Sequence, residues 1–332
     1  MDVPASVLFW LKTGVILAFC IGLSISPALW IGPRSYPLAP VSSMLPAIDR
    51  AVTLGLYFAL FVIAAIALVV SRPRWFIAGF LAVIAVFCLA DQTRWQPWVF
   101  QYSCLLAAAA LYSWNAADVE GARRTLNIAR LIVASTYVFS GLQKINPNFV
   151  ENDFPWIVQP ITSPFPSATD FLHVFGMAVL FVQVAFGIGL LTRRYRCVSL
   201  ILAIAMHLFI LAMFGPAGLN WNDIVWPWTA AMAVFDLMLF SGTPEFSWRE
   251  VVLSQTGSLS CGRGCFVRDA AGAKLLQSVG FVSVLGALFR QSNRGANLYD
   301  GCRKGFLARG DQVASGSHVT RHQRLESSTL GD

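Results

Sequence analysis

The sequence predicts an all-α, polytopic membrane protein with about eight transmembrane helices. Of its 332 residues, 56% are hydrophobic and only 12% are charged, whereas an ordinary soluble domain has roughly 25% charged residues. So few charges cannot cover the surface of a water-soluble protein of this size, which excludes a typical soluble enzyme and a disordered chain. The apolar residues form continuous runs rather than an alternating pattern, so they predict helices and not the strands of a membrane barrel.

Eight apolar runs have about the length that a ~30 Å hydrocarbon core requires. In chain order they are Val7–Ile25, Ala51–Val70, Trp75–Ala90, Pro97–Trp114, Leu126–Leu142, Phe171–Leu191, Val198–Phe214 and Ile224–Phe240. Lys12 interrupts the first run and no clear small-residue cleavage site follows it, so a cleavable signal peptide is not expected there. The predicted transmembrane domain is therefore residues 1–242.

Basic residues in the links between these runs give the predicted orientation. The short links after the second, fourth and sixth runs carry seven arginines: Arg72, Arg74, Arg123, Arg124, Arg193, Arg194 and Arg196. The links after the first, third, fifth and seventh runs carry four basic residues: Arg34, Arg50, Arg94 and Lys144. Because basic residues are enriched on the cytoplasmic side, we expect the N-terminus and the C-terminal tail in the cytoplasm. The odd-numbered links then face the periplasm, the lumen or the cell exterior.

The outward links are rich in polar and aromatic residues. Seven of the eleven tryptophans lie there, namely Trp30, Trp95, Trp98, Trp156, Trp221, Trp226 and Trp228. An interfacial aromatic belt with helix caps explains part of this pattern, but a belt is normally two-sided. The alternative is a pocket between helix ends. Its candidate substrate-binding residues are Asp91, Arg94, Trp98, Trp156, Asn222 and Trp228.

Among the polar or ionisable residues inside the runs, four are of particular interest: Arg130, Gln183, His207 and Asp236. Such groups are costly in lipid and usually face the interior of a helix bundle. Arg130 and Asp236 can pair with each other, or Arg130 can extend to the cytoplasmic surface. His207 can form a hydrogen bond between helices or contribute to a pocket beneath the outward links.

Lys144 is the most distinctive candidate catalytic residue. It ends an apolar run, and Gly141 and Pro147 bracket the point where the chain leaves the helix. A lysine that is partly removed from water has a lowered pKa and can act as a base. The alternative is a lysine whose stem lies along apolar surface while its ammonium group stays in water.

The segment Tyr137-Val-Phe-Ser-Gly-Leu-Gln-Lys-Ile-Asn-Pro-Asn-Phe149 resembles a motif of the vitamin K-dependent gamma-carboxylase membrane domain and its bacterial relatives, the horizontally transferred transmembrane domain (HTTM) family. The family motif has an aromatic residue, Gly-x-x-Lys-Leu, a polar turn and a second aromatic residue. Asp91-Gln-Thr-Arg-Trp95 resembles an Asp-x-x-x-Trp element in the preceding outward link, and His207 resembles a histidine in a later helix. The resemblance covers about residues 50–240.

This resemblance implies a site on the lumenal or periplasmic side. In the carboxylases, the lysine at the position of Lys144 deprotonates reduced vitamin K, so the resemblance implies that Lys144 is a base acting on a hydroquinone. His207 is the second candidate catalytic residue, and a quinone is the candidate cofactor. Two features depart from the carboxylases, which also carry a large lumenal domain: Trp98 stands where they have a histidine, and the tail after Phe240 has about 90 residues and is expected on the cytoplasmic side. We therefore expect a quinone, a lipid or another amphiphile as the ligand, and not peptide carboxylation.

Two other classes of function are alternatives to this interpretation of an amphiphile site. One is a non-enzymatic membrane component, such as a transporter subunit or an assembly partner, and the other is a DoxX-like quinone-linked redox protein. Convergence of Asp91, Lys144, His207 and Asn222 on one outward cavity would favour a ligand site. Separate lipid-facing positions would favour the non-enzymatic component.

Residues 243–332 differ in composition from the membrane domain. They carry 18 charged residues in 90 positions, against 23 in residues 1–242, and are rich in Ser, Gly and Arg. We expect a cytoplasmic, partly disordered tail with an interfacial helix at Leu275–Phe289, or alternatively a frame-shifted end. Cys261 and Cys265 with His318 and His322 are too widely spaced to predict a metal site. The net charge of +7 indicates contact with anionic membrane lipid rather than with nucleic acid.

Overall fold

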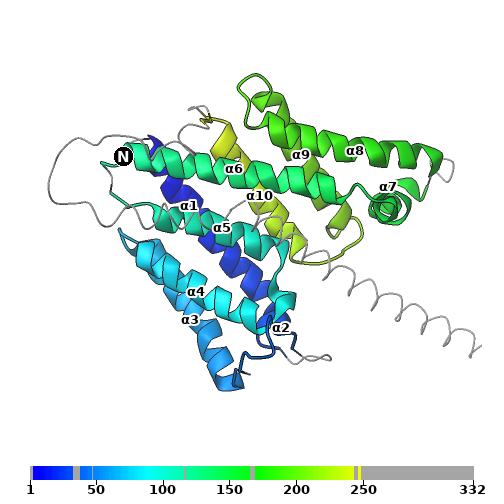
Figure 1. Ribbon diagram of the computed structural model, residues 1–332. Helices are drawn as coiled ribbons and strands as arrows, with labels where there is room; N and C mark the ends of the chain where they lie inside the picture. The colour runs from blue at the N-terminus through cyan, green and yellow to red at the C-terminus, as the bar shows by residue number, and fades with distance from the viewer. Residues whose placement is uncertain are drawn as a thin grey trace, which may run out of the picture. The chain divides into compact units, whose positions relative to one another are not determined.

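The computed structural model describes residues 3–32, 38–46, 48–115, 117–164, 169–242 and 246–247. These residues lie in one compact unit, residues 1–272, and form helices without a strand, which confirms the predicted all-α class for this part of the chain (Figure 1). The helices are α1 (Val3–Ile25), α2 (Pro27–Trp30), α3 (Arg50–Val69), α4 (Arg74–Ala90), η1 (Gln92–Arg94), α5 (Pro97–Leu111), α6 (Val119–Gln143), η2 (Phe149–Asp153), α7 (Phe154–Thr162), α8 (Thr169–Gly189), α9 (Arg196–Phe214) and α10 (Val225–Phe240). The predicted interfacial helix and the Cys–His pattern of the tail lie outside the described residues.

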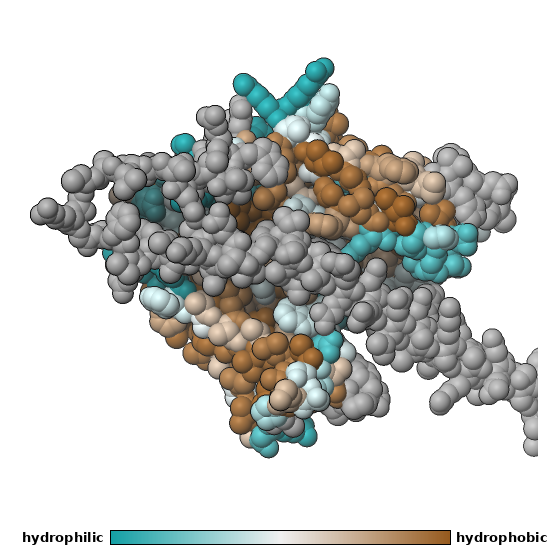
Figure 2. Space-filling model, viewed as in Figure 1, coloured by the Kyte–Doolittle hydropathy of each residue, from teal (hydrophilic) through white to brown (hydrophobic). Residues whose placement is uncertain are grey.

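Each of the eight apolar runs forms a helix. Among the described residues, four of these helices are long and apolar enough to cross a membrane: α1, α3, α6 and α9. The other four apolar stretches are shorter, in α4, α5, the second part of α8 and α10. Only 22% of the apolar window of α3 and of α9 is buried, and Phe58, Val62 and Ile201 are among their exposed apolar residues. Figure 2 shows broad apolar surfaces on the molecule. Such surfaces are compatible with an integral membrane protein.

The fifth run forms a longer helix than expected. The apolar pattern predicted a start at Leu126, whereas α6 begins at Val119. Asp118 causes the earlier start, because its carboxylate accepts a hydrogen bond from the backbone N–H of Gly121 at 2.8 Å. An N-cap of this kind satisfies a helix terminus even where the first turns are polar.

Long side chains from neighbouring helices cap several helix C-termini. The Lys12 ammonium donates to Ala67 O at 3.0 Å near the end of α3, and the Tyr57 hydroxyl donates to Leu23 O at 3.0 Å near the end of α1. Trp226 Nε1 donates to Phe214 O at 2.7 Å at the end of α9. The last four carbonyls of a helix lack partners within that helix, and an apolar environment offers no water to replace them. These polar residues therefore have a structural role.

Helix α1 packs against α3, α5, α6 and α10, which places it at the centre of the bundle. Helices α3 and α4 form a pair on one side with α5 next to α4, and α8 and α9 form a pair that contacts α6 and α10 (Figure 1). An aromatic core lies where α1, α4 and α5 meet, with Phe19 contacting the rings of Phe80, Trp98 and Tyr102. This core holds α4 and α5 to α1.

Gly22 gives a first test of this packing. A Cβ atom on Gly22 would lie 2.7 Å from Cζ3 of the buried Trp98, whereas a Cβ on Gly79 in α4 would meet nothing within 4 Å. We expect Gly22→Ala to destabilise the protein by about 1–3 kcal/mol, because overpacking a core forces side chains out of their preferred rotamers. Gly79→Ala should instead stabilise it by about 0.5–1 kcal/mol through helix propensity. Thermal unfolding of both variants in detergent micelles measures the difference, and equal melting temperatures would contradict the prediction.

Candidate functional site

Asp91 and Arg94, two of the predicted binding residues, are buried in the fold. Asp91 caps η1, accepting hydrogen bonds from Thr93 N at 3.1 Å and Thr93 Oγ1 at 2.9 Å. The Arg94 guanidinium donates to three backbone carbonyls, Leu29 O at 3.2 Å, Trp30 O at 3.0 Å and Phe87 O at 3.0 Å. Arg94 therefore connects the ends of α2 and α4. The N–H groups that could bind a ligand donate instead to these backbone carbonyls.

Trp98 and Trp228 also lie inside the bundle. Trp98 belongs to the aromatic core and is 2% exposed. Trp228 Nε1 donates to Gln101 Oε1 at 2.8 Å, and Gln101 Nε2 donates to Thr136 Oγ1 at 3.3 Å. These bonds join α10, α5 and α6. Gln101 was not among the predicted site residues, although a glutamine facing the interior of an apolar helix is a signal for such a contact.

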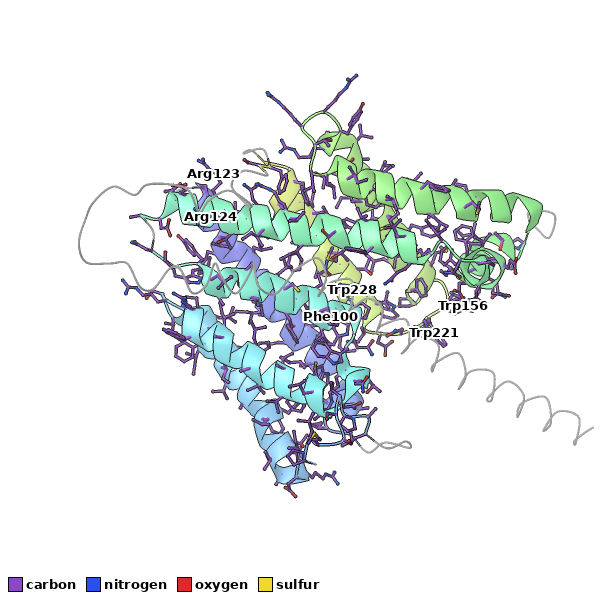
Figure 3. All side chains as sticks on the ribbon, in the orientation of Figure 1. Phe100, Arg123, Arg124, Trp156, Trp221 and Trp228 are labelled. Carbon is purple, nitrogen blue, oxygen red and sulfur yellow. The ribbon has the colours of Figure 1, made fainter. Side chains whose placement is uncertain are left out.

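Trp156 and Asn222 lie near the ends of α9 and α10. The Trp156 ring contacts those of Phe214, at 5.8 Å between centroids, and Trp221, at 5.4 Å (Figure 3). Asn222 is exposed with a φ of 55°, in a turn where a short polar side chain tolerates the left-handed conformation. Its backbone explains why an asparagine stands there.

Lys144 lies where α6 ends and meets α8. Its Nζ donates to Gln183 Oε1 at 2.6 Å and to Ser140 Oγ at 3.1 Å, and it lies 5.9 Å from the ring centroid of Phe149. Burial lowers the pKa of Lys144 to about 8. Gln183 is 4% exposed, so it offers the ammonium a neutral acceptor shielded from water.

Two features of the chain produce the surroundings of Lys144. A Cβ on Gly141 would lie 2.7 Å from Val184 Cγ2, so glycine allows α6 and α8 to approach closely one turn before Lys144. Beyond Lys144, η2 and α7 fold back over α8 through a buried cluster of Phe149, Phe154, Val158 and Leu180. The lysine is therefore half-buried between apolar elements.

His207 meets Tyr137 and Asp236 inside the bundle. The Tyr137 hydroxyl lies 2.5 Å from Asp236 Oδ2 and 2.7 Å from His207 Nε2, and His207 Nε2 lies 3.4 Å from Asp236 Oδ2. The three residues come from α6, α9 and α10, and all are buried. Tyr137 was missed as a site residue because tyrosine is common in apolar helices, although it lies two turns before Lys144 on the same face of α6.

Asp236 therefore pairs with Tyr137 and His207 rather than with Arg130. The Arg130 guanidinium donates to Leu239 O at 2.7 Å and to Asn127 Oδ1 at 2.8 Å. Like Arg94, Arg130 bonds to a carbonyl in the last turn of a neighbouring helix. The alternative in which Arg130 extends to the surface is also not seen, since the residue is buried.

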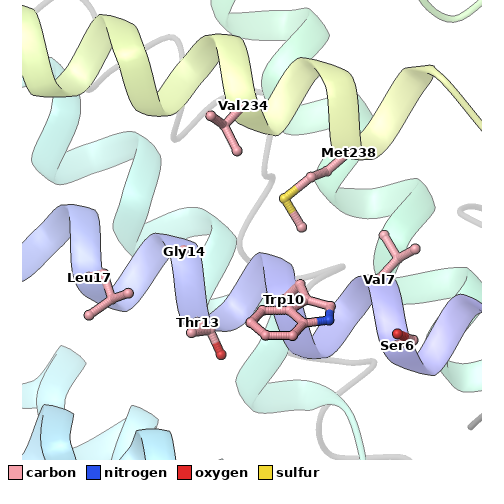
Figure 4. Close-up of a pocket in the computed structure, with 8 residues that line it drawn as sticks. All are labelled: Ser6, Val7, Trp10, Thr13, Gly14, Leu17, Val234 and Met238. Atoms are coloured by element: carbon pink, nitrogen blue, oxygen red, sulfur yellow. The ribbon is translucent and has the colours of Figure 1, made fainter.

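An apolar groove lies between α1 and α10 and has a volume of about 500 Å³ (Figure 4). It is lined by Ser6, Val7, Trp10, Thr13, Gly14, Leu17, Val234 and Met238. None of these is a predicted site residue. Among the residues that the structure describes, no three His, Cys, Asp or Glu side chains group in a way that could hold a metal ion.

The predicted site residues thus occupy separate surroundings. Asp91, Lys144, His207 and Asn222 do not converge on one cavity among the described residues, so the criterion of convergence does not favour a ligand site that all four share. Asp91 caps η1, Asn222 lies in an exposed turn, Lys144 contacts Gln183, and His207 contacts Tyr137 and Asp236. Tyr137, which contacts His207, lies on the same face of α6 as Lys144. Comparison with known protein families, curated proteins and solved structures gives no match for this chain.

Proposed function

We propose that the chain is a multi-pass membrane protein of eight spans with an outward-facing site for a quinone or a similar amphiphile, at the end of α6. In this proposal Lys144 is the base that accepts a phenolic proton from a reduced quinone, as the HTTM resemblance implies. Peptide carboxylation is not part of the proposal. Asp91, Arg94 and Trp98 then support the fold rather than contact the ligand.

The surroundings of Lys144 carry this proposal. Its ammonium contacts a hydroxyl and a side-chain amide but no carboxylate among the described residues. A lysine with an acidic partner keeps its proton, whereas the lowered pKa of Lys144, about 8, leaves a substantial neutral fraction near physiological pH. A general base works best when its pKa lies near the working pH.

The side chains around Lys144 suit an amphiphile with an aromatic head group. Phe149 lies beside the ammonium, and Leu142 and Ile145 on either side of Lys144 are 46% and 53% exposed. These apolar surfaces can contact a lipid-like tail while Lys144 and Gln183 contact a hydroxyl. A fully hydrated ligand would gain little binding free energy from these apolar side chains.

The distribution of Arg and Trp supports the proposed orientation. Arg123 and Arg124 lie at the beginning of α6, and Trp156 and Trp221 lie together beyond its other end (Figure 3). Helices α4, α5 and α10 have 17, 15 and 16 residues. At 1.5 Å per residue these helices are roughly 22–26 Å long, which is shorter than the ~30 Å hydrocarbon core. If they cross the membrane, the flanking aromatic and basic residues cover the remaining thickness.

Replacement of Lys144 tests the proposal. The protein is purified in lipid nanodiscs and titrated with a short-chain benzoquinol and a short-chain naphthoquinol, and bound ligand is measured by mass spectrometry. We expect Lys144→Met to reduce binding of the quinols at least tenfold, and Lys144→Arg to bind them without deprotonating them. Gln143→Met, one residue earlier on α6, is the matched control and should behave as the wild type. Wild-type binding by both Lys144 variants would contradict the proposal and favour a non-enzymatic membrane component.

A further inference from the structure

We propose that Tyr137, His207 and Asp236 form a buried proton-binding site, which takes up one proton and passes it between α10 and α9 through the Tyr137 hydroxyl. The inference is independent of any quinone at Lys144. It rests on the contacts among the three side chains and on two of their polar atoms. His207 Nδ1 and Asp236 Oδ1 are buried and have no hydrogen-bond partner among the described residues.

The electrostatic setting favours an added proton. With Asp236 ionised and His207 neutral, the three residues carry a net charge of −1 inside an apolar bundle, where an isolated carboxylate is costly. Asp236 is 0% exposed and His207 is 4% exposed, so water does not screen this charge. One more proton makes the group neutral overall.

Charged groups on the surrounding helices do not contact Asp236 directly. On α6, Arg130 and Lys144 each lie seven residues from Tyr137, which is about 10 Å along the helix axis. Arg130 donates to Leu239 O and Asn127, and Lys144 donates to Gln183 on α8 and to Ser140. On α1, which packs against α6 and α10, the Lys12 ammonium donates to Ala67 O on α3. Phe186 on α8 packs against Tyr137, and Tyr102 on α5 packs against Phe235. We therefore place the balancing proton within the three residues.

The hydrogen bonds define how the added proton is held. In one arrangement, Asp236 is ionised, Tyr137 donates to Asp236 Oδ2, and His207 is protonated on both nitrogens and donates from Nε2 to the Tyr137 oxygen. In the other, Asp236 carries a proton on Oδ2 and donates it to the Tyr137 oxygen, while the hydroxyl donates to a bare Nε2 of a neutral His207. Both arrangements hold three protons in total. They interconvert when two protons move in the same direction through the tyrosine hydroxyl.

The emptied state differs from both loaded arrangements at one common atom, His207 Nδ1. Both arrangements of the loaded site have a proton on His207 Nδ1. When the proton has left, Asp236 is ionised and accepts from the Tyr137 hydroxyl, Nε2 holds a proton and donates to the Tyr137 oxygen, and Nδ1 is bare. The protonation of Nδ1 therefore reports whether the site is loaded.

Nitrogen NMR of histidine-labelled protein in nanodiscs tests this proposal. The chain has four histidines, and His207→Gln identifies the His207 signals by their loss. From about pH 5 to about pH 9, we expect the Nδ1 signal to change from protonated to bare in one step, with one proton released. Asp236→Asn should abolish this coupled step, and Tyr137→Phe, which keeps the ring packed on Phe186, should shift its midpoint by at least about one pH unit because the relay atom is lost.

Infrared spectroscopy of the wild type gives a measurement that needs no variant. A carboxylic acid band that decreases together with the Nδ1 signal identifies the arrangement with protonated Asp236, and an imidazolium signal without this band identifies the other; either supports the proposal. A bare Nδ1 at every pH, a protonated Nδ1 at every pH, or an unchanged titration in Asp236→Asn would overturn it. Because neither measurement involves a quinone, failure here is separate from failure at Lys144.

Discussion

Replacing Arg94 by methionine is expected to destabilise the protein by about 3–5 kcal/mol. The guanidinium donates to Leu29 O, Trp30 O and Phe87 O, and it lies 3.9 Å from the Asp91 carboxylate. Methionine fills part of the space but leaves three buried carbonyls and a buried carboxylate without these contacts. Asp91 keeps its bonds from Thr93 and Phe87 O keeps the backbone N–H of Asp91, but the loss of the charged donor leaves part of each desolvation cost without compensation. Thermal unfolding in detergent micelles, followed by tryptophan fluorescence, measures the loss.

Three companion variants show where the effect arises. Arg72→Met removes an exposed arginine from the link between α3 and α4 and should leave the melting temperature nearly unchanged. Arg94→Lys keeps the positive charge but cannot reach three carbonyls at once, so an intermediate loss is expected. Adding Asp91→Asn to Arg94→Met should recover part of the stability, because no buried carboxylate remains. If Arg94→Met were as stable as Arg72→Met, Arg94 would not hold α2 and α4 together, and a role in ligand binding would regain support.

Replacing Gln183 by glutamate is expected to raise the pKa of Lys144 from about 8 towards its ordinary value of 10.5 or above. The Gln183 oxygen already lies 2.6 Å from Nζ, so a carboxylate there would form an ion pair with the ammonium. At pH 8 about half of the wild-type amine is neutral, against less than about one percent at the ordinary pKa. The rate of modification of Lys144 by an amine-selective reagent should therefore fall on the order of a hundredfold, as measured by mass spectrometry of the lysine-containing peptide.

The same substitution changes how stability depends on pH. In the wild type, the unfolded chain holds the Lys144 proton more tightly than the folded protein, with a pKa of 10.5 against about 8. Stability from this group therefore rises as the pH increases from about 8 to 10.5 and is lowest below pH 8. Gln183→Glu should remove this rise. Gln183→Leu, which withdraws the acceptor, should keep the modification rate at or above the wild-type value, and a slow rate in both variants would show that access and not the pKa controls the reaction.

The sequence alone predicted the helical class and the position of every long apolar helix. This succeeded because a continuous apolar run of sufficient length leaves a helix as the only way to satisfy its backbone in lipid. The ends of the helices were predicted less well. Helix α6 begins seven residues before its apolar run, since the Asp118 cap is a local polar contact that hydropathy does not record.

The candidate site residues were chosen by residue type and by position along the chain, and not by geometry. Lys144 and His207 were identified from their positions at the end and in the middle of apolar helices, where ionisable groups are unusual. Their partners were not identified: Gln183 is 39 residues from Lys144 along the chain, and Tyr137 is 70 residues from His207. A single sequence contains no information on which faces of two distant helices meet.

The sequence by itself therefore determined three features of this protein: apolar helices, arginines concentrated in the even-numbered links and a few polar residues inside the apolar runs. Only the tertiary structure decided what those polar residues do. In the folded protein, Arg94, Arg130 and Lys12 donate hydrogen bonds to backbone carbonyls of other helices. Tyr137, His207 and Asp236 come into contact with one another. The physical reason is that the hydrophobic effect has no directional preference, so it can be read from composition along the chain. A hydrogen bond depends on the distance and angle between two atoms, and only the packing of the helices sets their positions.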